Sequence, residues 1–175
     1  ISFEQVSKSF GSHTVLRDVE FSITPGRVHA LLGRNGAGKS TLFSIFLGLL
    51  AADSGTIRVA GAPWSREVLD HVGASVNGPA FYGHLSAAAN LRVHTRLLGL
   101  PESEIERVLA IVGLNGAGKK KAKSFSTGMK ARLALGQALL GDPEILVLDE
   151  PQNGLDPQGI VELRELLQNL AGAGH

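Results

Sequence analysis

The glycine-rich segment Gly33 to Ser40 constrains the fold of this chain more than any other part of the sequence. It fits the pattern G-x-x-x-x-G-K-[ST] at every fixed position. Such a segment needs a strand before it and a helix after it. The apolar run Arg27 to Leu32 predicts a buried parallel strand, and Lys39 to Leu50 predicts an apolar helix. This arrangement predicts an α/β architecture.

The residue types of this loop suit the binding of phosphate. Glycines let backbone N–H groups turn inward around phosphate oxygens, and the following helix presents its positive N-terminus to the same anion. The Lys39 ammonium reaches the β and γ phosphates of a nucleotide, and the Ser40 hydroxyl is a ligand for Mg²⁺. The predicted loop residues are Gly33, Arg34, Asn35, Gly36, Ala37, Gly38, Lys39 and Ser40.

A second candidate element is an acidic pair at the end of an apolar run. Ile145 to Leu148 predicts a buried strand, and Asp149 and Glu150 follow it directly. The carboxyl ends of parallel strands lie at the sheet edge where α/β proteins bind ligands, and the loop at Gly33 leaves its strand at the same edge. We expect Asp149 to face the magnesium held by Ser40, directly or through water. We expect Glu150 to polarise an attacking water.

The remaining pattern predicts a discontinuous core, over residues 1–76 and 141–175, that binds the nucleotide. Residues 77–140 are expected to form an inserted helical subdomain. The other expected strands are Ser2 to Val6 at a sheet edge, Val15 to Ile23, Thr56 to Ala60 and Val72 to Val76. The expected helices are Leu85 to Leu98, Ser103 to Val112 with Glu106 at capping-box spacing, Ser126 to Leu140, and one that begins at Pro157 with Asp156 as its N-cap.

Composition narrows the class of protein. The chain has 175 residues, 43% hydrophobic and 19% charged, which is typical of a globular domain. It has no cysteine, which excludes disulfides and thiol catalysis, and its formal charge of +1 argues against general nucleic-acid binding. No apolar run is as long as a transmembrane helix, which needs about 18 residues or more. Because the chain starts at Ile1 and stops at His175 after a Gly-Ala sequence, we expect a segment of a longer protein.

The segment Gly113 to Lys120 repeats the spacing of the glycine-rich loop, but Lys120 stands where Ser or Thr is required. A helix is predicted before it instead of a strand, and Lys121 to Ser124 after it is polar. A second phosphate site needs the opposite context. We therefore predict a solvated basic loop here.

Taken with the two motifs, the segment Phe125 to Lys130 resembles the signature region of the ATP-binding domain of ABC transporters. That family usually has L-S-G-G-Q here; Ser126 and Gly128 match it, whereas Thr127 and Met129 depart from it. A serine hydroxyl and a glycine N–H at a helix N-terminus suit an anion. The resemblance covers nearly the whole chain. It implies a P-loop NTPase (RecA-like) core with a mostly parallel central sheet, an N-terminal antiparallel β-region and the inserted helical subdomain.

The resemblance also implies roles for single residues. Phe10 matches the aromatic residue that stacks on adenine, and Thr41 joins the nucleotide-binding residues directly after the loop. Ser126 and Gly128 match residues that bind the γ-phosphate of an ATP held by a second subunit. Asp156 matches a residue that contacts that subunit.

Asn77 stands where the family usually has a glutamine that is a metal ligand and senses the permease. Asparagine keeps the carbonyl ligand on a side chain one methylene shorter. The segment Gly78 to Tyr82 looks like the ATPases of peptide-antibiotic and lantibiotic exporters. The family's switch histidine lies after a further strand, so His175 is not assigned that role.

The resemblance therefore implies an Mg-ATP-dependent ATPase subunit that forms a homodimer and powers a separate membrane permease, most simply for export. It implies a position on the cytoplasmic face of the cell membrane and no nucleic-acid partner. Two alternatives stay open: a soluble ABC-type ATPase outside transport, and a nucleotide-binding fragment that does not hydrolyse ATP.

Overall fold

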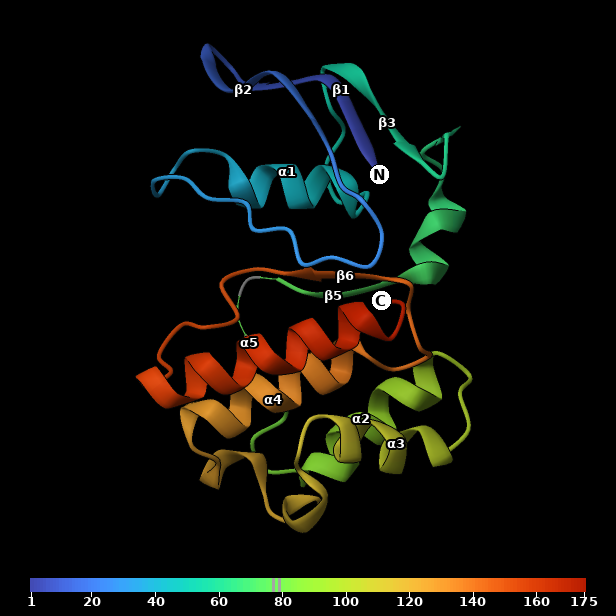
Figure 1. Cartoon of the computed structure of the whole chain (residues 1–175), viewed down its shortest axis with the longest axis vertical. Coiled ribbons are helices and arrows are strands. Elements are labelled where there is room, and N and C mark those ends of the chain that lie inside the picture. The colour runs from blue at the N-terminus through green and yellow to red at the C-terminus, as the bar shows by residue number, and fades with distance from the viewer. Residues whose placement is uncertain (77, 79) are drawn as a thin grey trace. The chain divides into compact units, whose positions relative to one another are not determined.

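The computed structural model describes residues 1–76, 78 and 80–175. They divide into a first unit, residues 1–70 with 171–174, and a second unit, residues 71–170 with 175. Each unit has its own sheet (Figure 1). The division into a nucleotide-binding core (residues 1–76 and 141–175) and a helical subdomain (residues 77–140) stays a prediction.

The first unit contains a four-stranded antiparallel sheet with the order β2-β1-β3-β4. The strands are β1 (Ser2–Phe10), β2 (His13–Ser22), β3 (Ser54–Val59) and β4 (Ala62–Pro63). Helix α1 (Lys39–Phe46) supplies the second layer. The core consists of buried apolar residues from strands and helix: Phe3, Val6, Leu16, Leu42, Ile45, Phe46 and Ile57. Within it the Phe3 ring stacks on Phe21 with the ring centroids 4.5 Å apart.

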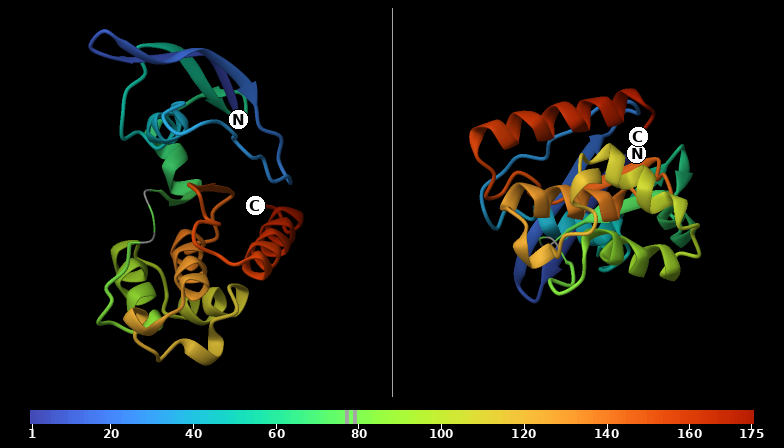
Figure 2. Two further views of the ribbon diagram at one scale, coloured as in Figure 1. Left: turned by 90° about the vertical axis from the view of Figure 1, so that its left-hand side faces the viewer. Right: turned by 90° about the horizontal axis from the view of Figure 1, so that it is seen from below.

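The second unit is built on two parallel strands, β5 (Val72–Ser75) and β6 (Ile145–Leu148), paired from Val72 with Ile145 to Ser75 with Leu148. Its helices are α2 (Ala87–Leu97), α3 (Ser103–Ile111), α4 (Thr127–Ala138) and α5 (Pro157–Gly172). They lie on one side of the two strands (Figures 1 and 2). Among residues 1–76, 78 and 80–175 there are also three short 3-10 helices: η1 (Arg66–His71), which spans the boundary of the two units, η2 (Asn115–Ala117) and η3 (Ala122–Ser124).

The core of the second unit joins all four helices. Its fully buried side chains include Leu91 from α2, Val108 from α3 and Leu133 from α4, and Leu163 and Leu170 from α5 pack in the same cluster. Two polar ties brace this core.

The first tie is the Asn90 side chain, which has no exposed surface. It accepts a hydrogen bond from the Tyr82 amide (2.7 Å) and donates to the carbonyls of Tyr82 (3.1 Å) and Ser86 (2.9 Å). The second tie is Arg107, which pairs with Glu104 (2.7 Å) and donates to the Leu139 carbonyl (2.8 Å). These bonds hold the loop before α2 and the end of α4 in place.

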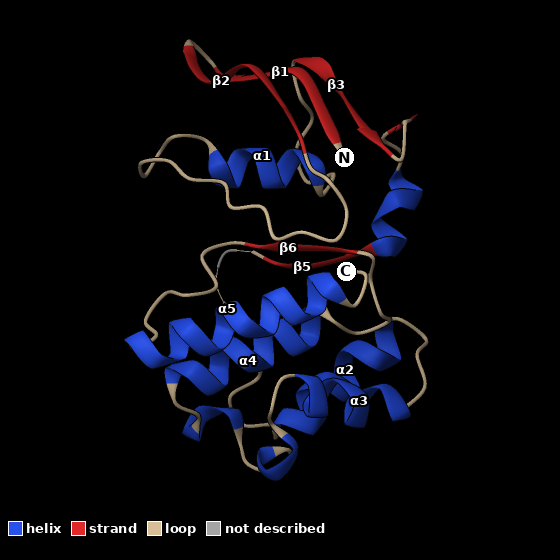
Figure 3. Cartoon of the chain, viewed as in Figure 1, coloured by secondary structure: helices blue, strands red, loops and turns tan. Residues whose placement is uncertain are grey.

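The segment Arg27 to Leu32 is a loop, so the prediction of a buried strand there is wrong. Figure 3 draws the stretch between β2 and α1 in the loop colour. All six residues are exposed, and Leu32 keeps 87% of its surface. The sheet of this unit is antiparallel and ends at β2 and β4, so the segment has no parallel neighbour within its own unit with which to form a ladder.

Two smaller predictions also fail. The N-terminal strand is not an edge strand, because β1 lies between β2 and β3 and bonds to both. The capping box at Ser103 does not form: α3 takes Glu102 as its N-cap without a side-chain bond. Glu104 and Arg107 instead form the ion pair of this helix. The other predicted helices and strands are present, with bounds shifted by a few residues.

Candidate functional site

The loop Gly33 to Ser40 has the backbone that a phosphate loop requires. Gly36 and Gly38 adopt φ values of 83° and 91°, in the left-handed region that favours glycine. Gly38 is also the N-cap of α1 and packs closely on β2: a Cβ there would lie 2.6 Å from Leu16 Cδ2. The loop therefore depends on glycine at these positions for its path into the helix.

The Lys39 ammonium lies over this loop. Its Nζ donates to the carbonyl oxygens of Gly33 (2.9 Å) and Arg34 (3.2 Å). Ser40 and Thr41 follow in the first turn of α1, where Ser40 is exposed and Thr41 half-buried. That turn contains no acidic residue. The positive end of the helix dipole and the ammonium thus act together, and the loop is electrostatically suited to an anion.

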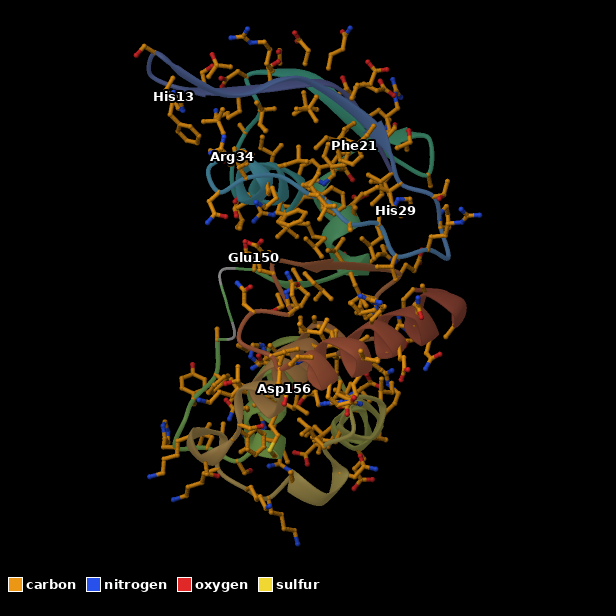
Figure 4. The ribbon with its side chains drawn as sticks, turned by 60° about the vertical axis from the view of Figure 1, so that its left-hand side comes forward. His13, Phe21, His29, Arg34, Glu150 and Asp156 are labelled. Carbon is orange, nitrogen blue, oxygen red and sulfur yellow. The ribbon has the colours of Figure 1, made fainter. Side chains whose placement is uncertain are left out.

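Phe10 lies at the end of β1, and its ring is 51% exposed. The Lys8 Nζ lies 5.8 Å from the ring centroid and 2.6 Å from Asp53. Hydrogen bonds from the Lys8 side chain and the Ser9 amide lower the pKa of Asp53. His13, which pairs with Phe10, lies at the same end of the first unit as Arg34 (Figure 4). The exposed ring of Phe10 offers an open aromatic face.

The acidic pair ends β6 in the second unit. The Asp149 amide donates to the Ser75 carbonyl (2.9 Å), which extends the parallel pairing by one bond, and Asp149 is half-buried. Glu150 is exposed, with a left-handed φ of 48°. Its carboxylate accepts a hydrogen bond from the Asn153 side-chain amide, and its carbonyl accepts one from the Asn153 N–H (3.0 Å). This contact was not predicted, although Asn153 follows Glu150 by only three positions, in a turn through Pro151.

Ser126, Gly128 and Asp156 line one groove between the N-terminal ends of α4 and α5. Ser126 is the N-cap of α4, and its Oγ accepts from the Met129 amide (3.2 Å). Asp156 Oδ1 accepts from the Gly159 amide (2.7 Å), as its predicted N-cap role requires. The groove has a volume of about 490 Å³. Asp156 is labelled in Figure 4. The structure therefore brings Asp156 to the same groove as Ser126 and Gly128, which precede it by about thirty residues.

The second glycine-rich segment, Gly113 to Lys120, has a different backbone. Gly116 and Gly118 do not have positive φ, unlike the two glycines of the phosphate loop. Carbonyl oxygens, not amides, face the nearest helix N-terminus: Lys120 accepts from Ala87 (3.1 Å) and Gly118 from Ala88 (3.0 Å). A carbonyl-lined loop repels phosphate. The segment agrees with the expectation of a basic loop.

The three predicted metal ligands are distributed over the chain. Ser40 belongs to the first unit and Asp149 to the second, and Asn77 lies outside the described residues. Across residues 1–76, 78 and 80–175, no group of three or more His, Cys, Asp or Glu side chains is placed to hold a metal ion. In the same residues, no helix has the length and apolar character to cross a membrane.

The α/β fold, the phosphate loop and the acidic strand end together define a P-loop nucleotide-binding protein. The profile of the ABC transporter family matches residues 16–153, and the chain belongs to this family. The resemblance inferred from the sequence is therefore confirmed.

Two similar proteins from this family are described as transport ATP-binding proteins. The chain is 44% identical to the lantibiotic transport ATP-binding protein SrtF of Streptococcus pyogenes, over 99% of this chain and 76% of that protein. It is 41% identical to the bacitracin transport ATP-binding protein BcrA of Bacillus licheniformis, over 98% of this chain and 57% of that protein.

The fold comparison agrees. The chain is similar to cbiO1 of Clostridium perfringens, part of the ABC transporter complex cbiONQ, with a TM-score of 0.89 and 29% identity over 99% of this chain and 74% of that one. A second solved ATP-binding subunit of an ABC transporter gives a TM-score of 0.81 at 30% identity. The predicted fold class is thus confirmed, and the findings support the transporter assignment over the two alternatives.

Proposed function

We propose that this chain is the ATP-hydrolysing subunit of an ABC transporter that exports a peptide antibiotic through a separate membrane permease. The family assignment supports ATP binding. The names of SrtF and BcrA support the antibiotic class, because both are described as transport ATP-binding proteins for such compounds. Because ATP is a cytoplasmic metabolite, we propose that the subunit binds to the permease at the cytoplasmic face of the membrane.

The observation that carries the proposal is the backbone of Gly33 to Ser40. The left-handed glycines at 36 and 38 and the ammonium of Lys39 form a cationic loop of the kind that holds nucleotide phosphates. In this proposal Arg34, Asn35, Ala37 and Thr41 also surround the phosphates, although the Ala37 amide donates to the Arg34 carbonyl (3.0 Å) in the chain as it stands. The exposed ring of Phe10 stacks on the adenine.

The donor set also suits magnesium. Ser40, Asp149 and Asn77 offer one hydroxyl, one carboxylate and one carbonyl oxygen, which are the hard oxygen ligands that Mg²⁺ prefers. Few protein ligands would be needed, because phosphate and water would supply the other oxygen ligands. When bound, the ion neutralises charge on the β and γ phosphates.

Glu150 is the proposed general base. Its carboxylate is exposed at a strand end and is oriented by the amide of Asn153, so it can polarise a water for in-line attack on the γ-phosphate. Glu150 holds the proton taken from that water, while the ammonium of Lys39 balances charge on the departing phosphates.

We further propose that two copies of the chain bind two ATP molecules between them. Ser126 and Gly128 would meet the γ-phosphate held by the other copy, and Asp156 would contact that copy directly. The groove between α4 and α5 supports this role because it collects these residues around one concave surface. In this scheme residues 1–76 and 141–175 hold the nucleotide, and residues 77–140 transmit closure to the permease near Asn77.

The test is phosphate release from Mg-ATP by the wild-type chain and by Glu150→Gln. We expect the variant to bind ATP and to lose at least about 100-fold in turnover, the range for removal of a general base. Glu165→Gln is the matched control, because Glu165 is an exposed glutamate on α5. Normal turnover in Glu150→Gln would contradict the assigned base.

A further inference from the structure

The proposed function gives no individual role to the lysines of the basic loop (residues 113–120) or of the segment that follows it, residues 121–124. In this stretch Lys119, Lys120, Lys121 and Lys123 place four ammonium groups in five consecutive positions. All four residues are exposed. These four side chains are called the lysine cluster below. The loop lies at the end of the second unit opposite β5 and β6 (Figures 1 and 2).

The backbone beneath the lysine cluster is fixed by the protein. The Lys123 amide donates to the Gly83 carbonyl and the Ala122 amide donates to the Leu85 carbonyl, both at 2.9 Å. Ala117 and Ala122 anchor the loop in the core of the unit. The cluster is therefore presented at a defined place on the surface, as a docking element requires.

Charge pairing sets these lysines apart from three arginines of the same unit. Three arginines neutralise acidic side chains, in the pairs Arg92–Glu102 (3.0 Å), Arg107–Glu104 (2.7 Å) and Arg132–Glu162 (2.6 Å). In the described part of the chain, no lysine of the cluster makes an ion pair with an acidic side chain. The positive charge of the cluster is thus directed to solvent without internal compensation.

The backbone next to an exposed aromatic residue, Tyr82, is hydrogen-bonded to the backbone of the cluster. Tyr82 is 52% exposed, and its amide is held by Asn90 (2.7 Å). The next residue, Gly83, receives the hydrogen bond from Lys123. A tyrosine ring has an apolar body and a polar tip, and such rings concentrate at the interface between lipid and water.

We propose that the lysine cluster and Tyr82 form a docking surface for an anionic phospholipid bilayer. Lysine is a compact, hydrated charge on a flexible stem, so a cluster of lysines suits a diffuse negative surface. A defined acidic peptide is recognised better by the planar fork of arginine, and the arginines named above are engaged inside the unit. This docking does not depend on nucleotide, so it can fail or hold independently of ATP binding.

The test is flotation of the chain with vesicles made of equal parts phosphatidylglycerol and phosphatidylcholine, compared with pure phosphatidylcholine. The test variant changes all four lysines of the cluster to Gln. The matched control removes the same charge from four exposed arginines elsewhere: Arg17→Gln, Arg27→Gln, Arg66→Gln and Arg164→Gln. Thermal melting and ATP binding are measured for both variants to show that each is folded.

Each basic residue near an anionic bilayer contributes about fivefold to the partition coefficient. We expect binding to anionic vesicles only, a loss of about 600-fold in the lysine variant from four factors of about five, and a much smaller loss in the arginine control. Salt at about 1 M should abolish binding by screening. Equal losses in both variants, binding to neutral vesicles, or binding to polyglutamate or RNA without binding to vesicles would each overturn the proposal.

Discussion

Alanine at Gly38 should disrupt the phosphate loop through two separable effects. The first is backbone strain, because Gly38 has a φ of 91°, and a left-handed backbone costs an L-residue about 1–2 kcal/mol. The second is steric. The new Cβ would lie 2.6 Å from Leu16 Cδ2 and 3.2 Å from the Val15 carbonyl oxygen. Forced contacts of this kind cost about 1–3 kcal/mol. The expected loss in the free energy of unfolding is therefore about 2–5 kcal/mol.

Gly36 supplies the matched control. Its φ of 83° is similar, but a Cβ there would meet nothing within 4 Å. Gly36→Ala should therefore lose only the strain, about 1–2 kcal/mol. Urea unfolding of both variants, followed by circular dichroism, measures the difference. Equal losses in the two variants would refute the argument that Gly38 is required for close packing on β2.

Three further predictions concern polar contacts. The hydrogen bond from Lys8 lowers the pKa of Asp53 below its ordinary value of 3.8. The contribution of Asp53 to stability is therefore complete above pH 3.8 and is lost as the pH falls through the lowered pKa. In Lys8→Met, an NMR titration should show the pKa of Asp53 rising toward 3.8. Arg107→Gln should lower the free energy of unfolding in urea by about 1–3 kcal/mol, because the Leu139 carbonyl and the Glu104 carboxylate lose their donor. Arg92→Gln removes a more exposed ion pair and should lower it by only about 0–1 kcal/mol. Asn90→Ala should cost about 2–4 kcal/mol and speed amide exchange at residues 82–86; an unchanged exchange rate would contradict its bracing role.

Features encoded locally could be predicted from the sequence. The signature helix begins after Ser126 because a serine hydroxyl there caps a free amide, and this requires only neighbouring residues. Asp156 caps α5 for the same reason. The apolar run before Asp149 becomes β6, although its partner β5 lies far away in the chain. The phosphate loop could also be predicted, because the spacing of its glycines determines its backbone conformation.

Features that depend on distant partners could not be predicted. Apolar character marks Arg27 to Leu32 as suited to burial, but a strand forms only where a neighbouring strand accepts its bonds. The central position of β1 follows from the return of β3, more than forty residues later. The groove between α4 and α5 and the contact of Asn153 with Glu150 likewise arise from chain folding, which spacing alone does not specify.

Calorimetric titration of the folded chain with Mg-ATP tests the central claim most directly. The account predicts saturable binding to one site, weakened about tenfold to 100-fold in Lys39→Ala, because a charged hydrogen bond contributes about 1.5–3 kcal/mol. Lys120→Ala, from the glycine-rich segment that lacks a phosphate-binding backbone, should bind as the wild type does. An absence of binding in a folded sample, or equal binding by Lys39→Ala, would contradict the account.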